Sequence, residues 1–266
     1  MGVLHIPYRP SKPREYGWTV VNDRGIGINV WMDIAKMAGS YVDFAKLGIG
    51  TAYLIENLDE KISWLKAHDI EVILGGTLFE TYWAQDKLDQ YRVLLAHSGL
   101  KWVEISSGSY PIPLDEKAAL VKDFTRHHHF HVMAEVGQKS DLSSMTAEDY
   151  AEEALKLREA GADKVILEGR GSGRGGIYGQ DGRLDVHIMN AVLEVLPIEE
   201  VIFEAPLESQ QILFIREFGS NVNLGNIAHA DILSLEALRV GLRYDTMDAL
   251  GLSAYHEHVG SGRNNK

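Results

Sequence analysis

One plan recurs along the chain: a short β-rich run ends in polar residues, and an amphipathic stretch follows it. Eight such runs occur, at 17–23, 41–48, 71–76, 101–108, 131–137, 164–169, 200–206 and 221–226. Strands that alternate with helices predict an α/β fold with a parallel sheet. Eight repeats within 266 residues fit a single (β/α)8 TIM barrel. A doubly wound open sheet is the main alternative.

The stretches between the predicted strands have helical patterning. Residues 58–69 place Leu58, Ile62 and Leu65 on one stripe, with charged residues elsewhere. The stretch that follows Thr146 has this residue as a cap, acidic residues in its first turn and Gly161 at its end. Both stretches are therefore predicted to be helices.

The domain organisation follows from the lack of an internal linker. No proline- or glycine-rich segment divides the chain, so residues 1–266 are predicted to form one TIM-barrel domain. The barrel would span about 17–245, preceded by an N-terminal extension. The C-terminal residues, about 257–266, have the composition of a loose tail.

Composition excludes several classes of function. The chain has no cysteine, which excludes disulfides, thiolate metal sites and a cysteine nucleophile. A net charge of −12 disfavours general binding to nucleic acid or anionic membranes. There is neither an apolar run long enough to span a membrane nor the apolar core of a signal peptide, so we expect a cytoplasmic protein. An anionic substrate would need local Lys and Arg side chains or a bound cation.

Four of the predicted strands end in the same way, on a glutamate. These residues are Glu104 in "WVEIS", Glu135 in "MAEVG", Glu168 in "ILEG" and Glu204 in "IFEAP". In a TIM barrel the active site forms at the carboxyl ends of the strands, where these side chains would converge. Any one of them could instead cap a neighbouring loop, but four in the same phase favour a shared site.

The first two strands add further charged residues near their ends. Asp23 ends the first strand, and Asp43 and Lys46 belong to the second. Like charges in a small space cannot all remain ionised without compensation. Mg²⁺, which takes oxygen ligands, is one solution and a lysine among the acids is another. We therefore expect Asp43 and the four glutamates to be candidate Mg²⁺ ligands.

A glycine-rich segment follows the sixth predicted strand. "GSGRGG" at 171–176 formally matches a dinucleotide fingerprint, but "IYGQDGR" intervenes before any helix. A Walker loop is excluded because no G-K-[ST] is present. What remains is a mobile loop that carries Arg170 and Arg174 beside the acidic pocket, or a plain flexible loop. Guanidinium groups and backbone amides suit phosphate or sulfonate oxygens.

The histidine-rich segment "RHHHFH" at 126–131 resembles a metal site in composition. It lies between a predicted helix and the start of the fifth strand, which is the stability face of a barrel rather than its catalytic face. We therefore do not expect it to bind a metal.

The ordered motifs of the chain resemble those of the phosphosulfolactate synthase family. They run from about Lys12 to Thr246 and are "KPREYGWTVVNDRG", "YVDFAKLGIGT", "GGTLFE", "VEISSG", "AEVGQK", "EAGADKVILEGRGSG", "VIFEAPLESQQ", "NVNLGNI" and "LEALRVGLRYDT". Each motif is modest by itself, but the set in this order is specific and covers nearly the whole chain.

The resemblance implies a TIM barrel that catalyses the Mg²⁺-dependent addition of sulfite to phosphoenolpyruvate, giving (2R)-phospho-3-sulfolactate. This carbon–sulfur lyase reaction belongs to routes to coenzyme M or sulfolactate. Sulfite would attack the terminal CH₂ carbon, and charge would move onto the substrate carboxylate as an enediolate-like species. A divalent cation would stabilise this species, and an acid would protonate the adjacent carbon.

The resemblance also assigns roles to residues. Lys139 matches the lysine favoured as the acid, with Lys46 as the second catalytic candidate, and the acidic strand ends would include the Mg²⁺ ligands. The expected substrate-binding residues are Arg170, Arg174, Asn223, Gly225 and Asn226. The last three belong to "NLGN" on the eighth strand, before a helix expected at 231, where barrels usually bind phosphate. The expected partners are small anionic substrates, with self-association into a homo-oligomer left open.

Three positions depart from the family pattern. Ser107 stands where the family commonly has "EISDG" or "EISNG", Gln138 where a second lysine is frequent, and Gly171 where the family has "GRESG". Two alternatives therefore stay open: an enzyme that adds another nucleophile to an enol phosphate, and a non-catalytic binding or stress protein. The retained Lys139, Asp43 and glutamates argue against the second.

Overall fold

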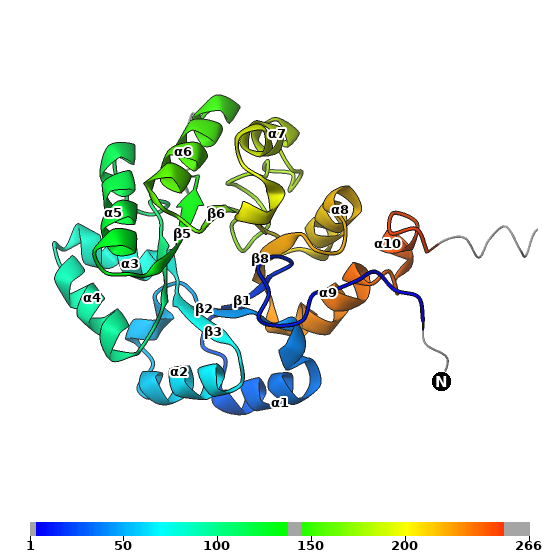
Figure 1. The fold of residues 1–266 in the computed structure, drawn as a ribbon, viewed down its shortest axis with the longest axis horizontal. Helices are drawn as coiled ribbons and strands as arrows, with labels where there is room; N and C mark the ends of the chain where they lie inside the picture. Colours follow the sequence, from blue (N-terminus) through cyan, green and yellow to red (C-terminus); the bar gives the residue numbers. More distant parts are fainter. Residues whose placement is uncertain (1–3, 138–144, 253–266) are drawn as a thin grey trace, which may run out of the picture.

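The computed structural model describes residues 4–137 and 145–252 of the chain. All eight predicted strands are present and run parallel in one sheet, in the order β3-β2-β1-β8-β7-β6-β5-β4. Their bounds are β1 Thr19–Asp23, β2 Phe44–Leu47, β3 Glu71–Leu74, β4 Trp102–Ile105, β5 His131–Val136, β6 Lys164–Leu167, β7 Val201–Glu204 and β8 Asn223–Ile227. The terminal strands β3 and β4 contact each other and bring the sheet close to a complete ring (Figure 1).

Helices lie outside this ring; α1 to α8 connect successive strands, and α9 and α10 follow β8 (Figure 1). Their bounds are α1 Ile28–Ala38, α2 Leu58–Ala67, α3 Gly76–Ala84, α4 Leu88–His97, α5 Leu114–Arg126, α6 Ala147–Ala160, α7 Val186–Val195, α8 Glu208–Phe218, α9 Ile232–Arg239 and α10 Tyr244–Met247. The TIM-barrel prediction is therefore confirmed. The connection between β3 and β4 contains two helices, α3 and α4.

Local sequence chemistry sets the helix ends where it was expected to. The side chain of Thr146 accepts a hydrogen bond from the Asp149 amide, and the Asp149 carboxylate accepts one from the Thr146 amide. This capping box satisfies two amides at the start of α6. Gly161 ends the same helix with a positive φ of 121°, a conformation that glycine adopts without a steric penalty. Ile62 and Leu65 of α2 are buried, as the predicted stripe requires.

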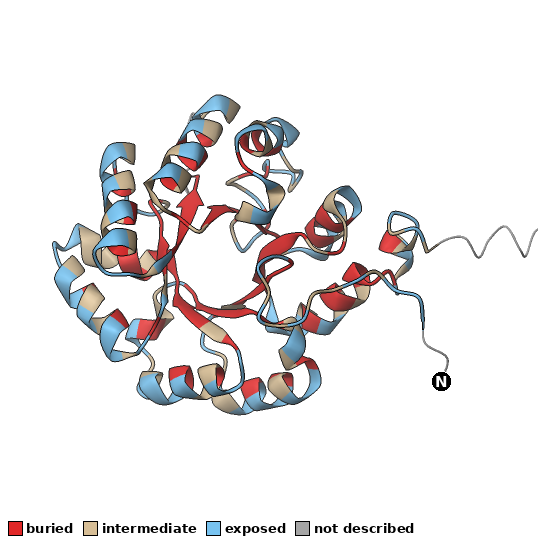
Figure 2. Cartoon of the chain, viewed as in Figure 1, coloured by how far each residue is buried: buried red, intermediate tan, exposed pale blue. Residues whose placement is uncertain are grey.

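The interior of the barrel follows the two-residue period of the strands. A layer of apolar side chains fills the space enclosed by the sheet, and its buried members are Trp18, Val20, Phe44, Ile73, Met133, Ile166 and Ile202. A larger apolar layer lies between sheet and helices, so the strands are buried on both faces (Figure 2). Because side chains alternate between the faces, the residue two positions beyond each inner apolar residue also faces inward.

This period explains how the charged end of the barrel is built. Phe44 is followed two residues later by Lys46, Met133 by Glu135, and Ile202 by Glu204. Trp102 and Ile166 precede Glu104 and Glu168 in the same way. The carboxyl end of the inner layer is therefore charged, while the amino end is aromatic and aliphatic.

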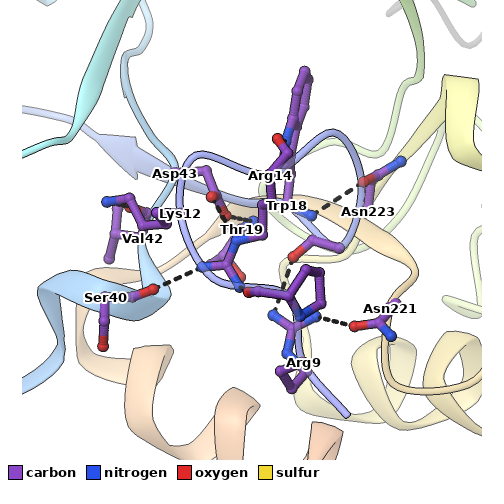
Figure 3. Close-up of polar contacts among 12 residues, drawn as sticks. Arg9, Lys12, Arg14, Trp18, Thr19, Ser40, Val42, Asp43, Asn221 and Asn223 are labelled. Carbon is purple, nitrogen blue, oxygen red and sulfur yellow. Dashed lines mark hydrogen bonds and ion pairs between the residues drawn. The ribbon is translucent and has the colours of Figure 1, made fainter.

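Side chains of the N-terminal extension contact the amino end of the barrel (Figure 3). The Arg14 guanidinium donates hydrogen bonds to the Asp43 carboxylate at 2.8 Å and to the Ser40 carbonyl at 2.7 Å. Asp43 also accepts a hydrogen bond from the Thr19 amide at 2.8 Å. The Lys12 ammonium donates to two main-chain carbonyl groups, those of residues 39 and 42. We call Lys12 and Arg14, together with Asp43 and the main-chain carbonyl groups that they contact, the amino-end plug.

Within the described residues, no helix has both the length and the apolar character needed to cross a membrane.

Candidate active site

The four glutamates at the strand ends converge, as the sequence analysis expected. Glu104, Glu135, Glu168 and Glu204 line one small cavity of about 100 Å³ at the carboxyl end of the barrel, together with Lys46. All five side chains are buried, with between 1% and 7% of each residue exposed. We call this cavity, with these five residues, the carboxylate cup.

Lys46 is the centre of the carboxylate cup. Its ammonium lies 3.0 Å from Glu104 Oε2 and 2.7 Å from Glu204 Oε1. Burial by itself would lower the pKa of Lys46, but the nearby Glu104, Glu204 and Glu135 carboxylates raise it well above its ordinary value. A buried ammonium shared by two carboxylates therefore remains protonated.

Glu104 is held in the cup by the start of a helix. Its Oε1 atom accepts a hydrogen bond of 2.7 Å from the amide of Gly76, the first residue of α3. Helix N-termini favour negative charge. Burial nevertheless raises the pKa of Glu104, because it outweighs the effect of Lys46. A Cβ atom at Gly76 would lie 2.1 Å from Ser106 Oγ and 2.9 Å from Glu104 Oε1, so only glycine allows this close approach.

Two asparagines, Asn22 and Asn226, also line the cup. Asn226 has a left-handed backbone with φ of 57°, and its amide donates to the Gly169 carbonyl at 2.9 Å and to Glu204 Oε2 at 3.4 Å. The Asn22 side chain donates a hydrogen bond to Asn226. Gly48 has no side chain where a Cβ atom would lie 2.3 Å from Asn22 Oδ1. Asn22 was not predicted as a site residue, although its position two residues after Val20 indicates that it faces inward.

The glycine-rich loop brings one of its two arginines into the site. Arg170 lines the carboxylate cup, whereas Arg174 is exposed and is not part of the cup lining. The loop is folded as a turn, in which the Gly173 amide donates to the Arg170 carbonyl at 2.7 Å. Gln210 of α8 donates to the Gly173 carbonyl at 2.9 Å and attaches the loop to the barrel.

The structure corrects the expectations for Asp43 and Asn223. Asp43 precedes β2 and binds Arg14 in the amino-end plug, at the opposite end of the barrel from the glutamates. Asn223 begins β8, and its side chain accepts from the Trp18 amide at 3.0 Å in the same region (Figure 3). Asp43 is three residues from Lys46, and residues three apart in a strand point to opposite faces. Neither residue can therefore share a ligand with the cup.

Asp23 is buried near the cup but faces the helices. Its carboxylate lies 2.6 Å from the Lys61 ammonium and accepts from the Trp31 indole at 2.7 Å. It also accepts from the amides of Gly25 and Ile26, at 2.8 and 2.7 Å. Asp23 therefore fixes the turn after β1.

The remaining expected site residues differ in their placement. Gly225 is buried in β8 beside Glu204, and a Cβ atom there would lie 3.6 Å from Glu204 Cγ. Lys139 and Gln138 fall outside the described residues. Ser107 accepts a hydrogen bond of 2.9 Å from the buried Lys117, which also pairs with Glu153. Ser107 is not part of the cup lining, so this departure from the family pattern acts behind the site.

Glu80 of α3 supports the site, and the sequence analysis did not single it out. Its buried carboxylate accepts from the Ser106 hydroxyl and from the amides of Gly108, Ser109 and Tyr110. It thereby holds the loop after β4, next to Glu104. The sequence could have indicated Glu80, because it is the only charged residue of the helix Gly76–Ala84.

The acids of the cup are chemically suited to a magnesium ion. The described residues contain no preassembled group of three or more His, Asp or Glu side chains in a metal-binding arrangement, and Lys46 lies between two of the carboxylates. Mg²⁺ is, however, usually bound through one or two carboxylates, waters and substrate oxygens rather than an all-protein cage. Glu135 and Glu168, which line the cup beside the Lys46 pair, fit that requirement.

The histidine segment lies at the other end of the barrel. His127 contacts Asp123 at 3.0 Å and His131 contacts Asp163 at 3.1 Å. These pairs lie at the end of α5 and the start of β5, as the sequence analysis placed them.

Comparison with known proteins assigns the family. Residues 7–245 match the family model described as (2R)-phospho-3-sulfolactate synthase (ComA). The chain belongs to the phosphosulfolactate synthase family. It is 42% identical to a phosphosulfolactate synthase of Bacillus subtilis, over 91% of this chain and 97% of that protein. The corresponding protein of Methanocaldococcus jannaschii is 40% identical, over 86% of this chain and 93% of its own length.

A solved structure supports the architecture. The 3-hexulose-6-phosphate synthase of Salmonella typhimurium superposes with a TM-score of 0.52 at 15% identity, covering 88% of this chain and 98% of that chain. This similarity concerns the barrel fold. The family membership rests on the sequence matches, which extend over nearly the whole barrel.

Proposed function

We propose that this protein is a phosphosulfolactate synthase that joins sulfite to phosphoenolpyruvate. The observation that carries the proposal is the carboxylate cup, which combines four buried glutamates and one buried lysine in a chain of this enzyme family. The product would be (2R)-phospho-3-sulfolactate. In the reaction the sulfur lone pair of sulfite forms a bond to the terminal CH₂ carbon, and the adjacent carbon takes up one proton.

Lys46 would stabilise charge rather than donate the proton. The pair of electrons from the substrate double bond moves toward the substrate carboxylate as the carbon–sulfur bond forms. A fixed ammonium close to this developing charge lowers the barrier electrostatically. The pKa of Lys46 is raised well above its usual value by its glutamate neighbours, and an efficient proton donor has a pKa near the working pH. The proton donor would therefore be Lys139, as the family resemblance implies.

Glu135 and Glu168 would hold a Mg²⁺ ion at the cup. When bound, this ion would supply a Lewis acid for the oxygens of the substrate carboxylate. Glu104 and Glu204 would keep Lys46 in place, since both contact its ammonium. Arg170, on the rim of the cup, would bind a substrate anion through its guanidinium group.

The direct test is an assay with purified protein, phosphoenolpyruvate, sulfite and Mg²⁺. We expect the enol absorbance to fall only when both substrates are present, and phosphosulfolactate to appear in equal amount. Chelation should abolish turnover and added Mg²⁺ should restore it, because Glu135 and Glu168 cannot themselves neutralise the developing charge. Turnover that persists after exhaustive chelation would remove Mg²⁺ from the proposal. Consumption of the enol phosphate without sulfite, or with another nucleophile only, would replace the proposed reaction.

A further inference from the structure

A second, larger hollow adjoins the carboxylate cup. Its volume is about 550 Å³, and it lies between the turn after β1 and the segment after β8. Four residues line both the hollow and the cup, namely Asn22, Arg24, Gly171 and Asn226. The two spaces are therefore adjacent at these residues.

The two spaces differ in charge. Among the described residues, four glutamates line the cup beside Lys46, Arg24 and Arg170, whereas the larger hollow is lined by Arg24 and His229 and by no carboxylate. A phosphate dianion would be repelled by the glutamates but not by the walls of the larger hollow. An enol phosphate therefore fits best with its phosphate in the larger hollow and its reacting carbons over the cup.

Arg24 lines both the cup and the larger hollow, and its guanidinium is free to bind a ligand. The preceding Asp23 fixes the local backbone, because it accepts from the amides of Gly25 and Ile26 and contacts Lys61. Arg24 itself is exposed, and within residues 4–137 and 145–252 its side chain forms no hydrogen bond or ion pair. An unpaired guanidinium beside an anion-sized space has the fork geometry that binds phosphate oxygens.

Gly171 is the reason that Arg24 can lie there. A Cβ atom at position 171 would be 2.3 Å from Arg24 Nη2 and 3.4 Å from Arg24 Cζ. Any side chain at this position would displace the guanidinium, and a glutamate, as in the family pattern "GRESG", would also offer it a carboxylate partner. The backbone of Gly171 does not have a positive φ, so its lack of a side chain matters here rather than its conformational freedom.

We propose that Arg24 binds the phosphate of the substrate, and that Gly171, which has no side chain, leaves this guanidinium unpaired and increases the affinity for the phosphate. This inference rests on the proposed function for the identity of the substrate, since it assigns the phosphate of phosphoenolpyruvate to the larger hollow. It adds a residue to the site that the chain's departure from the family pattern at position 171 makes available.

The test is direct binding measured by calorimetry, without turnover, using phosphoenolpyruvate and inorganic phosphate as probes. Arg24→Ala should weaken phosphoenolpyruvate binding by about 10- to 100-fold, the effect of losing a charge-assisted hydrogen bond. Arg24→Lys should recover part of the affinity, because an ammonium keeps the charge but not the fork. The matched control is Arg183→Ala, which removes an exposed arginine that pairs with Asp181 outside both spaces.

The role of Gly171 is tested by a double-mutant cycle. Gly171→Glu should weaken phosphoenolpyruvate binding about as much as Arg24→Ala, and should add little further loss in the Arg24→Ala background. Equal losses in both backgrounds would mean that the glutamate repels the ligand directly, and would overturn the role of Gly171. Gly171→Ala keeps the charge unchanged and should give an intermediate loss by displacing Arg24.

The results separate this inference from the proposed function. Normal affinity of Arg24→Ala in a protein that makes phosphosulfolactate would overturn the inference and leave the function standing. Arg24-dependent binding of both probes without sulfite addition would support the phosphate site and overturn the function. Failure of the unmodified protein to bind either probe would overturn both.

Discussion

The two ends of the barrel use buried charge in opposite ways. In the amino-end plug each charge has a dedicated partner: Arg14 pairs with Asp43, and Lys12 donates to main-chain carbonyl groups (Figure 3). In the carboxylate cup one ammonium, that of Lys46, contacts two carboxylates, and two more glutamates line the same cavity. Both regions are buried, so burial alone does not distinguish structure from function.

What distinguishes them is the local balance of charge and hydrogen bonds. A buried ion pair whose remaining polar atoms are satisfied contributes a fixed geometry, and removing one partner is costly. Shifted pKa values do not separate the two ends, because burial raises the pKa of Asp43 in the plug as well as that of Glu104 in the cup. The cup differs in placing four carboxylates around one ammonium. The barrel therefore uses one-to-one charge pairing at its amino end, whereas its carboxyl end gathers four carboxylates around Lys46.

The largest effect is expected from Lys46→Met. The substitution keeps much of the side-chain volume but removes the ammonium from between Glu104 and Glu204, so developing negative charge on the substrate would no longer be stabilised. We expect kcat to fall on the order of 10²–10⁴, the range for an electrostatic or acid–base group. Steady-state kinetics at saturating substrate, with circular dichroism to verify folding, provide the measurement.

A second substitution, Lys139→Arg, tests whether Lys139 acts as a positive charge or as a proton donor. An arginine retains the positive charge but scarcely releases its proton, so a comparable loss of kcat in Lys139→Arg supports Lys139 as the acid. Near-normal kcat in Lys46→Met would contradict the role of the ammonium.

The matching change at the other end is Arg14→Met, which should affect stability instead of catalysis. It leaves Asp43 buried and without its guanidinium partner, and breaking a buried pair in this way costs about 3–5 kcal/mol. We expect a lower urea midpoint with kcat unchanged at temperatures where the variant is folded. A large loss of kcat in the folded variant would show that the plug contributes to the site, and the comparison between the two ends would fail.

The barrel and the phase of its acidic residues were predictable from sequence, because both depend on short-range periodicity. Eight strands, the helix cap at Thr146 and the convergence of Glu104, Glu135, Glu168 and Glu204 all follow from local patterns. The inner apolar residue two positions before each of these glutamates carries the same information. These features were confirmed because strand direction and side-chain alternation leave little freedom.

The errors came from residues whose placement depends on the exact start of a strand. Asp43 lies one residue before β2 and Asn223 is the first residue of β8, so both belong to the amino end. The placement of Arg24 against Gly171 could not be predicted either, because the two segments are far apart in the sequence. Such a contact depends on how the turn after β1 meets the turn after β6, which no local pattern specifies.

The smallest effect expected is a difference in the pH dependence of stability between a buried acid of the cup and a partly exposed acid that is paired with one arginine. Burial raises the pKa of Glu104 in the cup, so folding favours its protonated form. Its contribution is fully present below the pKa of the unfolded chain and is lost as pH rises through the higher folded pKa. Glu200, at the amino end, has a lowered pKa because of its hydrogen bond with Arg158. Its contribution is present above the unfolded pKa and is lost as pH falls through the lower folded pKa.

Glutamine variants of the two acids should differ in stability from the unmodified protein, with opposite dependences of this difference on pH. As pH rises from acid to neutral, Glu104→Gln should gain stability relative to the unmodified protein, because the wild-type carboxylate becomes ionised in a buried site. Glu200→Gln should lose relative stability over the same rise, because the wild-type carboxylate becomes ionised beside Arg158. Urea midpoints of the three proteins across this pH range provide the measurement. Parallel slopes for the two variants would show that Lys46 compensates the charge of Glu104 as well as Arg158 compensates that of Glu200.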